Sequence, residues 1–230
     1  MPAPTPDQVR ARLDALPSAR GFVLPHHGLM AAALPELHAG HETMDRALTL
    51  DPRHLAPLER ETVRLAILSA CEEPVGTHHL RTFFHAGASE AQALAIFRPA
   101  ARAAGASRYA TLDAAWSARF ATTMRDAYRD GARALVAPLA EPVARIALAA
   151  IQAANDQARG LALEIEAALA AGATEAQLAE ALSSVIRPRG VNRFLRAADA
   201  WLGLIRAGRV PASAALAAWA ATPDQGPMRL

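Results

Sequence analysis

An internal repeat at a separation of 85 residues constrains the fold of this chain more than any other feature. The segment GASEAQ at 87–92 matches GATEAQ at 172–177, and GASRYATLDAAW at 105–116 matches GVNRFLRAADAW at 190–201 with no gap between the two matches. Self-similarity at a fixed separation indicates a duplicated structural unit whose copies bury a common core. The chain is therefore predicted to contain two tandem copies of one helical unit, packed together as a pseudo-dimer.

The residues of the repeat indicate helices joined by tight turns. In each copy a glycine, Gly87 or Gly172, is placed to end one helix in a left-handed conformation. Two residues later a hydroxyl side chain can cap the next helix, and a glutamine three residues further on can complete a capping box. These capping pairs are Ser89 with Gln92 and Thr174 with Gln177. Each copy is thus predicted to contain a helix, a tight turn and a second helix.

Composition and periodicity favour an all-α fold. Apolar residues make up 52% of the chain and aromatic residues only 5%, so alanine-rich helices can pack closely. The segment 58–70 is apolar on nearly all faces at helical spacing, which predicts a helix inside the core. The predicted organisation is an N-terminal helical segment at 1–50, a first repeat at 51–130, a second repeat at 131–205 and a tail at 206–230.

Several classes of function are excluded by the residues that the chain lacks. All 24 basic residues are arginine, so Schiff-base and lysine-nucleophile chemistry is ruled out. A net charge of +2 implies no nucleic-acid partner. The single cysteine, Cys71, cannot form an internal disulfide and fits a reducing compartment. Because we find neither a signal peptide nor an apolar run of about 18 residues, we expect a cytoplasmic protein with no membrane partner.

The two copies differ in the residues that could carry chemistry. The first copy gathers such residues in the segment 59–87, namely Glu59, Glu61, Cys71, Glu72, Glu73, His78, His79, Arg81 and His85. At a shift of 85, the second copy places Ile146, Asp156, Leu163 and Glu164 opposite Glu61, Cys71, His78 and His79. One active site per chain, in the first copy, is the prediction.

This pattern resembles the alkylhydroperoxidase-D/carboxymuconolactone decarboxylase superfamily. The resemblance is carried by a helix that opens with Arg-Glu at 60–61, a short polar link, and a histidine eight residues before the glycine of A-G-x-[ST]-x-x-[EQ], a spacing that His79 and Gly87 hold. It covers 55–116 well and 140–201 more weakly. It implies an all-helical fold and a homo-oligomer, here a dimer or trimer of tandem chains, a state that alanine-rich helices with an apolar excess also favour.

The peroxidase branch of this superfamily uses Cys-x-x-Cys followed four residues later by histidine. Counting back from His79 places Glu72 and Val75 at the cysteine positions, and counting back from His78 places Cys71 and Pro74 there. Without a second thiol, the usual disulfide cycle cannot turn over, although a lone Cys71 thiolate could still be oxidised. A thiol peroxidase-type protein or a redox sensor based on Cys71 is the less favoured alternative, because neighbouring acidic residues raise a thiol pKa.

The decarboxylase branch lacks the cysteines and fits the segments TVRLAILSA and HHLR better. The resemblance implies an acid–base enzyme that acts on a small unsaturated acidic or lactone substrate. His79 is the candidate acid–base residue, since an imidazole ordinarily titrates near neutral pH, and Glu61 is its candidate partner. His78 is a weaker catalytic candidate, and Arg81 or Arg108 could bind a substrate carboxylate. We expect no organic cofactor and no metal.

Two further alternatives remain open from the sequence. A non-catalytic oligomeric protein could keep the fold while its site has decayed, as in the second copy. A metal could bind His78 and His85, seven residues apart, with Glu72 and Glu73 nearby, although no known ligand motif is present. The remaining N-terminal histidines are predicted to lie in an irregular, exposed and solvated region: His26, His27, His38 and His41.

Overall fold

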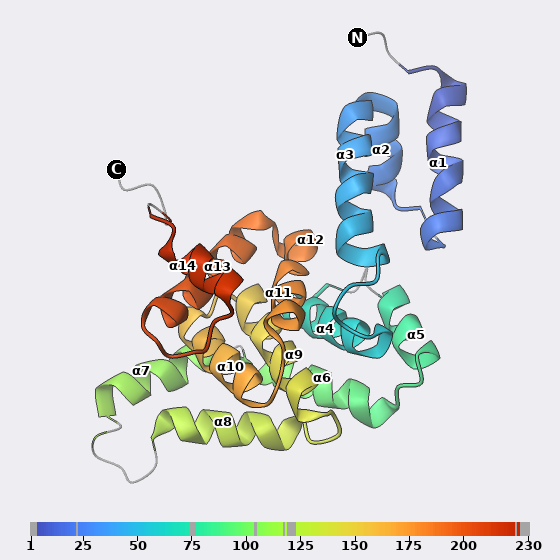
Figure 1. Cartoon of the computed structure of the whole chain (residues 1–230). Helices are drawn as coiled ribbons and strands as arrows, with labels where there is room; N and C mark the ends of the chain where they lie inside the picture. The colour runs from blue at the N-terminus through green and yellow to red at the C-terminus, as the bar shows by residue number, and fades with distance from the viewer. Residues whose placement is uncertain are drawn as a thin grey trace. The chain divides into compact units, whose positions relative to one another are not determined.

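A computed structural model describes residues 4–21, 23–73, 77–103, 105–116, 118, 123–223 and 225. Every regular element among these residues is helical, which confirms the all-α prediction (Figure 1). The chain divides into two compact units, residues 1–52 and residues 53–230. None of the described helices combines the length and the apolar character needed to cross a membrane.

The first unit consists of α1 (Pro6–Arg20), α2 (Pro25–Ala33), α3 (Pro35–Asp45) and a π-helical turn (Arg46–Leu50). Each of the three α-helices begins with a proline, which suits the first helical position because the missing N–H would have no helical partner there. The expectation of an irregular region around His26 and His27 is therefore wrong, since Pro25 begins α2. Residues buried in this unit include Leu16, His27, Met30, Ala31 and His38.

The first half of the second unit contains α4 (Pro57–Ala70), α5 (Thr77–His85), α6 (Glu90–Ala103), α7 (Ala106–Trp116) and α8 (Met124–Leu135). Helix α4 confirms the core helix predicted at 58–70, and it packs against α5, α6 and α9. Its buried face includes Val63, Ala66 and Ile67, and also one carboxylate, Glu61. A charged side chain in this position requires partners, because an unpaired buried charge is costly.

The second half contains α9 (Glu141–Ala154), α10 (Ala158–Ala170), α11 (Glu175–Ser183), α12 (Ile186–Arg189), α13 (Val191–Arg206) and α14 (Ala214–Ala221). Every residue of α9 from Ala144 to Ala154 is buried. Small alanine side chains allow α4, α10 and α11 to approach this helix closely. Helices α4 and α9, the first helices of the two predicted copies, thus pack together at the centre of the unit.

The turns of the repeat have the predicted chemistry. Gly87 and Gly172 adopt φ values of 90° and 92°. The backbone N–H of Gln92 donates to Ser89, and that of Gln177 donates to Thr174, while each glutamine side chain accepts from the backbone of its capping residue. The left-handed turns and the capping boxes are therefore confirmed.

The first helices of the two predicted copies are not separated by the same number of residues as the later helices. The later helices begin 85 residues apart, at Glu90 and Glu175, but α4 and α9 begin 84 apart. The left-handed residues that follow α4 and α9, Glu72 and Asp156, are also 84 apart. The second copy therefore has one residue more between Asp156 and Gly172 than the first copy has between Glu72 and Gly87.

The last helices of the two predicted copies, α7 and α13, pack against different neighbours. Helix α13 packs against α9, α10, α11 and α12, whereas the main contacts of α7 are with α8 and α10 (Figure 1). Trp201 of α13 is buried. The side chain of Trp116 in α7 lies outside the described residues, so its predicted equivalence to Trp201 stays a prediction.

Candidate acid–base site

Helices α4 and α5 bring Glu61 and His79 into direct contact. The Nδ1 atom of His79 lies 2.8 Å from Oε2 of Glu61, within hydrogen-bond distance. The carboxylate is only 4% exposed, whereas the imidazole is 20% exposed. The buried carboxylate of Glu61 thus lies behind the His79 ring, which solvent or a small ligand can reach.

Arg64 engages the other oxygen of the same carboxylate. Its Nη1 atom donates to Oε1 of Glu61 over 2.6 Å, one helical turn along α4. Burial acts to raise the pKa of Glu61, but the hydrogen bond with His79 and the charges of Arg64 and His79 outweigh burial and hold that pKa below its ordinary value. Glu61 is therefore ionised at neutral pH.

The ionised state of Glu61 fixes the direction of its hydrogen bond with His79. A carboxylate can only accept, so Nδ1 of His79 must carry a proton and donate it to Oε2. In the neutral ring this leaves the lone pair on Nε2. The arrangement holds the imidazole in one tautomer and presents Nε2 as the nitrogen that can take up or release a proton.

A second acidic residue supports the start of α4. Glu180 of α11 accepts hydrogen bonds through Oε2 from the backbone N–H groups of His54 and Leu55, at 2.7 and 2.9 Å. Burial is the main influence that lowers the pKa of Arg64, and the charges of Glu61 and Glu180 oppose it. Glu180 therefore joins α11 to the segment before α4, and its negative charge also acts on Arg64.

The other candidates of the first copy lie at varying distances from this pair. The ring of the half-buried His78 has its centroid 4.0 Å from that of His79. Arg81 is exposed, and as residues two positions apart on a helix do not share a face, it projects away from His79. His85 is also exposed. The side chain of Arg108 lies outside the described residues.

Cys71 follows α4 and contacts a residue of the second copy. The Nε atom of Arg189 lies 3.0 Å from its sulfur, and Nη2 of the same arginine donates to the carbonyl of Ala70. Burial raises the pKa of the Cys71 thiol, Arg189 opposes this effect, and Glu73 adds to it, so the pKa stays above its ordinary value. A resting thiol is poorly suited to nucleophilic redox chemistry at neutral pH.

The second copy holds an ion pair between the helices that correspond to α4 and α5. Nη1 of Arg145 on α9 lies 3.4 Å from Oε2 of Glu164 on α10, and both side chains are buried. Because α4 and α9 begin 84 residues apart, Arg145 corresponds to Glu61, which corrects the assignment of Ile146 from the uniform shift of 85. This pair contains no imidazole, the side chain that ordinarily titrates near neutral pH.

Sequence reasoning missed three residues of these arrangements. Arg64 could have been found, because its i, i+3 spacing from Glu61 on a predicted helix is that of an ion pair. Arg145 was hidden by the additional residue in the second copy. Glu180 lies more than 120 residues from its hydrogen-bond donors, and no local pattern indicates such a contact.

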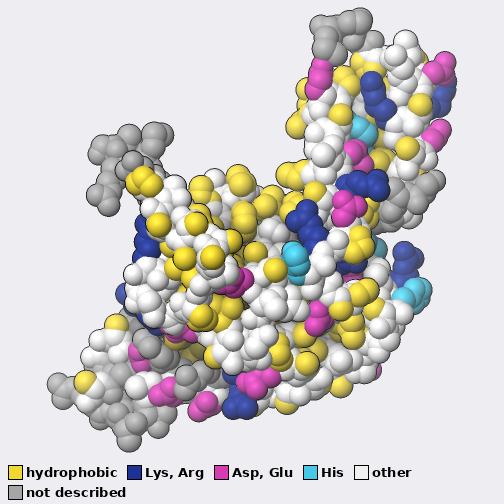
Figure 2. Space-filling view, viewed as in Figure 1, with side chains coloured by type: hydrophobic (Ala, Val, Ile, Leu, Met, Phe, Trp, Pro, Cys, Tyr) yellow, Lys and Arg dark blue, Asp and Glu magenta, His cyan; other side chains and the backbone are white. Residues whose placement is uncertain are grey.

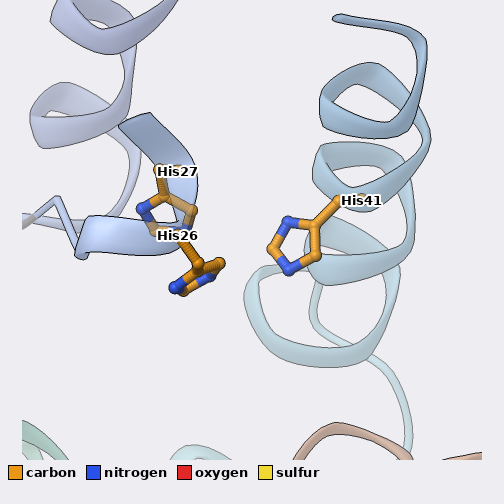
Figure 3. Close-up of side chains that lie close together, drawn as sticks. All are labelled: His26, His27 and His41. Atoms are coloured by element: carbon orange, nitrogen blue, oxygen red, sulfur yellow. The ribbon is translucent and has the colours of Figure 1, made fainter. Parts of the chain in front are cut away.

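Within the described residues, the group of side chains close enough to hold a metal ion lies elsewhere, in the first unit. It consists of His26, His27 and His41 (Figure 3). The prediction of an irregular region is wrong, because α2 and α3 form there. The predicted exposure is confirmed for His26 but is wrong for His27, which is fully buried. His38 is also buried.

No family model, curated protein or solved structure matches this chain. The function proposed below is supported by the geometry around Glu61 and His79, together with the resemblance of the sequence segments that carry them.

Proposed function

We propose that this chain is an acid–base enzyme similar to carboxymuconolactone decarboxylases, acting on a small unsaturated acidic or lactone substrate. The observation that carries the proposal is the hydrogen bond between the buried carboxylate of Glu61 and the half-buried imidazole of His79. This pairing is the one expected of a histidine that is oriented for proton transfer by a carboxylate.

Each group has a separate role in the proposed reaction. Decarboxylation breaks the bond between the substrate carbon and its carboxylate, releases CO₂ and leaves an electron pair that the conjugated carbonyl accepts. His79, protonated at Nε2, donates a proton to that carbon and is then reprotonated by solvent. Glu61 remains ionised throughout, since Arg64 and His79 hold its pKa low, and it stabilises the charged imidazolium.

The substrate carboxylate requires a cation outside the Glu61–Arg64 pair. Arg108 is the group we propose for this role, and Arg81 is the weaker candidate because it projects away from His79 on α5. No organic cofactor or metal is assigned to this step.

We also propose that the protein is a cytoplasmic homo-oligomer. Large apolar side chains are exposed on the second unit, namely Phe84, Leu94, Val191 and Leu195. Figure 2 shows apolar side chains gathered on the surface over α13 and α14. Burial of such patches commonly drives association. Sedimentation of a monomer at micromolar concentration would count against an oligomer.

A non-catalytic protein is the second candidate, and the second copy favours it. There the first two helices of the copy are joined by the buried ion pair Arg145–Glu164, which contains no imidazole. The thiol peroxidase alternative has less support, because the pKa of Cys71 is raised.

The test measures CO₂ release and loss of ultraviolet absorbance for a panel of unsaturated carboxylic acids and lactones. His79→Gln keeps the size and polarity of the side chain but cannot exchange a proton, so turnover should fall by roughly 10²–10⁴-fold with the fold preserved. Cys71→Ser should leave turnover nearly unchanged. His85→Gln, an exposed histidine of the same helix, is the matched control.

Two outcomes would contradict the proposal. If Cys71→Ser abolishes activity while His79→Gln is mild, the thiol alternative must be revived. If the wild-type protein turns over nothing in the panel, and the variants behave identically, the non-catalytic candidate becomes the better explanation.

A further inference from the structure

Three histidine side chains of the first unit converge between α2 and α3. His26 and His27 belong to the first turn of α2, and His41 belongs to α3. One ring nitrogen from each lies within 4.8 Å of the others, and the ring centroids are 4.0, 5.3 and 5.7 Å apart. Figure 3 shows the His41 ring directed across the space toward the two rings of α2. The cluster is separate from the acid–base site, which belongs to the second unit.

We propose that His26, His27 and His41 form a binding site for a divalent transition metal, with zinc as the reference ion. Neutral imidazole is a good ligand for zinc, copper and nickel, and is the commonest side-chain metal ligand. Tetrahedral zinc with Zn–N distances of about 2.0–2.1 Å needs its nitrogen ligands about 3.3 Å apart. Closing from 4.8 Å to that separation requires modest side-chain rotation, which the exposed His26 can supply.

Glu42 adds a negative charge beside the cluster. Its Oε1 atom lies 3.3 Å from Nδ1 of His41, and both side chains are half-buried. A carboxylate that pairs with a metal-binding imidazole fixes the ring and increases its basicity. Three imidazoles also leave a fourth tetrahedral position, which water or the Glu42 carboxylate can fill. The residues present thus meet the ligand number and charge that a divalent ion requires.

Metal binding competes with the hydrogen bond between Leu24 and His27. The backbone N–H of Leu24 donates to Nδ1 of His27 over 3.0 Å, so the neutral ring carries its proton on Nε2. If Nδ1 binds the metal, it can no longer accept from Leu24. If Nε2 binds the metal, the ring proton moves to Nδ1, which then cannot accept either. The hydrogen bond is therefore lost in both cases. The loss of one hydrogen bond costs about 1 kcal/mol. This is small beside the roughly 10–16 kcal/mol with which structural zinc sites bind.

A metal in this position would join the first turn of α2 to α3. The fully buried His27 is already held in place by packing, so one ligand is fixed before the ion arrives. Binding to the folded chain alone would raise the thermal stability of the protein in proportion to the metal concentration. The proposed decarboxylation needs no metal, so the two proposals can fail independently.

The test uses the full-length protein without a histidine tag. Isothermal titration with zinc chloride, and competition with a chromophoric zinc chelator, should show one ion per chain. Thermal unfolding followed by circular dichroism should shift to higher temperature with zinc. In His41→Gln, and separately in His26→Gln, the affinity should fall by more than the roughly 10–100-fold that loss of an outer partner of a ligand costs.

His26→Gln is the decisive variant, since His26 is exposed and its replacement should disturb the packing of the unit less than that of the half-buried His41. His85→Gln is the matched control, because it removes an exposed histidine of α5 and should retain full zinc affinity. The proposal is overturned if the wild-type chain binds no zinc. Equal zinc affinity in His26→Gln, His41→Gln and the control would overturn it as well.

Discussion

Replacing Glu61 by glutamine tests how strongly the buried charge cluster depends on a carboxylate. Glu61 offers two acceptor oxygens, one to Arg64 at 2.6 Å and one to His79 at 2.8 Å. An amide has one acceptor and one donor group, so Glu61→Gln must place an NH₂ against either Arg64 or Nδ1 of His79. The variant keeps the volume of the side chain, and any loss of stability therefore reports on charge and hydrogen bonding.

The size of the expected stability loss follows from the burial of the Glu61–Arg64 ion pair. Removing one partner of a buried ion pair usually costs about 3–5 kcal/mol, because it leaves an uncompensated charge. The Arg64 side chain is 12% exposed and also interacts with the charge of Glu180, so the lower end of that range applies. We expect Glu61→Gln to reduce the free energy of unfolding by about 3 kcal/mol. For a chain of this size, that corresponds to a decrease in Tm of roughly 6–12 °C.

The assay is urea unfolding at pH 7, followed by circular dichroism and tryptophan fluorescence. Glu90→Gln is the control, since Glu90 is exposed at the start of α6 and its loss should cost less than about 1 kcal/mol. The double variant Glu61→Met/Arg64→Met should cost less than the sum of the two single changes, with a coupling of about 1–3 kcal/mol. A loss below about 1 kcal/mol for Glu61→Gln, or additive single changes, would refute the reasoning.

Two further predictions concern stability. The pKa of Glu61 is lowered from 4.5 in the folded chain, so its contribution is complete above that pH and is lost as the pH falls through the lower folded-state value. Acid unfolding of Glu61→Gln should therefore be less steep than that of the wild type, and identical profiles would contradict the assignment. Gly160→Ala should destabilise the chain by about 1–3 kcal/mol in urea, because a Cβ atom there would lie 2.6 Å from the side chain of the buried Gln152. An unchanged urea midpoint would show that Gln152 can move aside.

Local patterns in the sequence predicted much of the second unit. The apolar periodicity of 58–70 predicted α4, and the Gly-x-Ser/Thr turns predicted the ends and caps around Gly87 and Gly172. These features depend on residues within one or two turns of each other, so a single sequence contains the necessary information. The pairing of Glu61 with His79 was proposed from the resemblance, and the structure places the two side chains in contact.

Other features depend on long-range packing or on register, which local patterns do not contain. The region of His26 and His27 was interpreted as irregular and exposed, yet Pro25 starts a helix whose third residue, His27, is buried in the unit. The uniform shift of 85 failed in the first helix of the second copy, because one additional residue precedes the matched motifs. The contact of Glu180 with the segment before α4 depends on the packing of α11, which follows from the whole fold.

The tautomer of His79 tests the central claim most directly, and it needs no substrate. Nitrogen-15 NMR of the wild-type chain at pH 8.5, with His79 assigned through the His79→Gln variant, reports which ring nitrogen carries the proton. Donation to an ionised Glu61 predicts a proton on Nδ1 and an unprotonated Nε2, and Glu61→Gln should weaken this preference. A proton on Nε2 in the wild type, or a tautomer that Glu61→Gln leaves unchanged, would contradict the claim that Glu61 orients His79 for proton transfer.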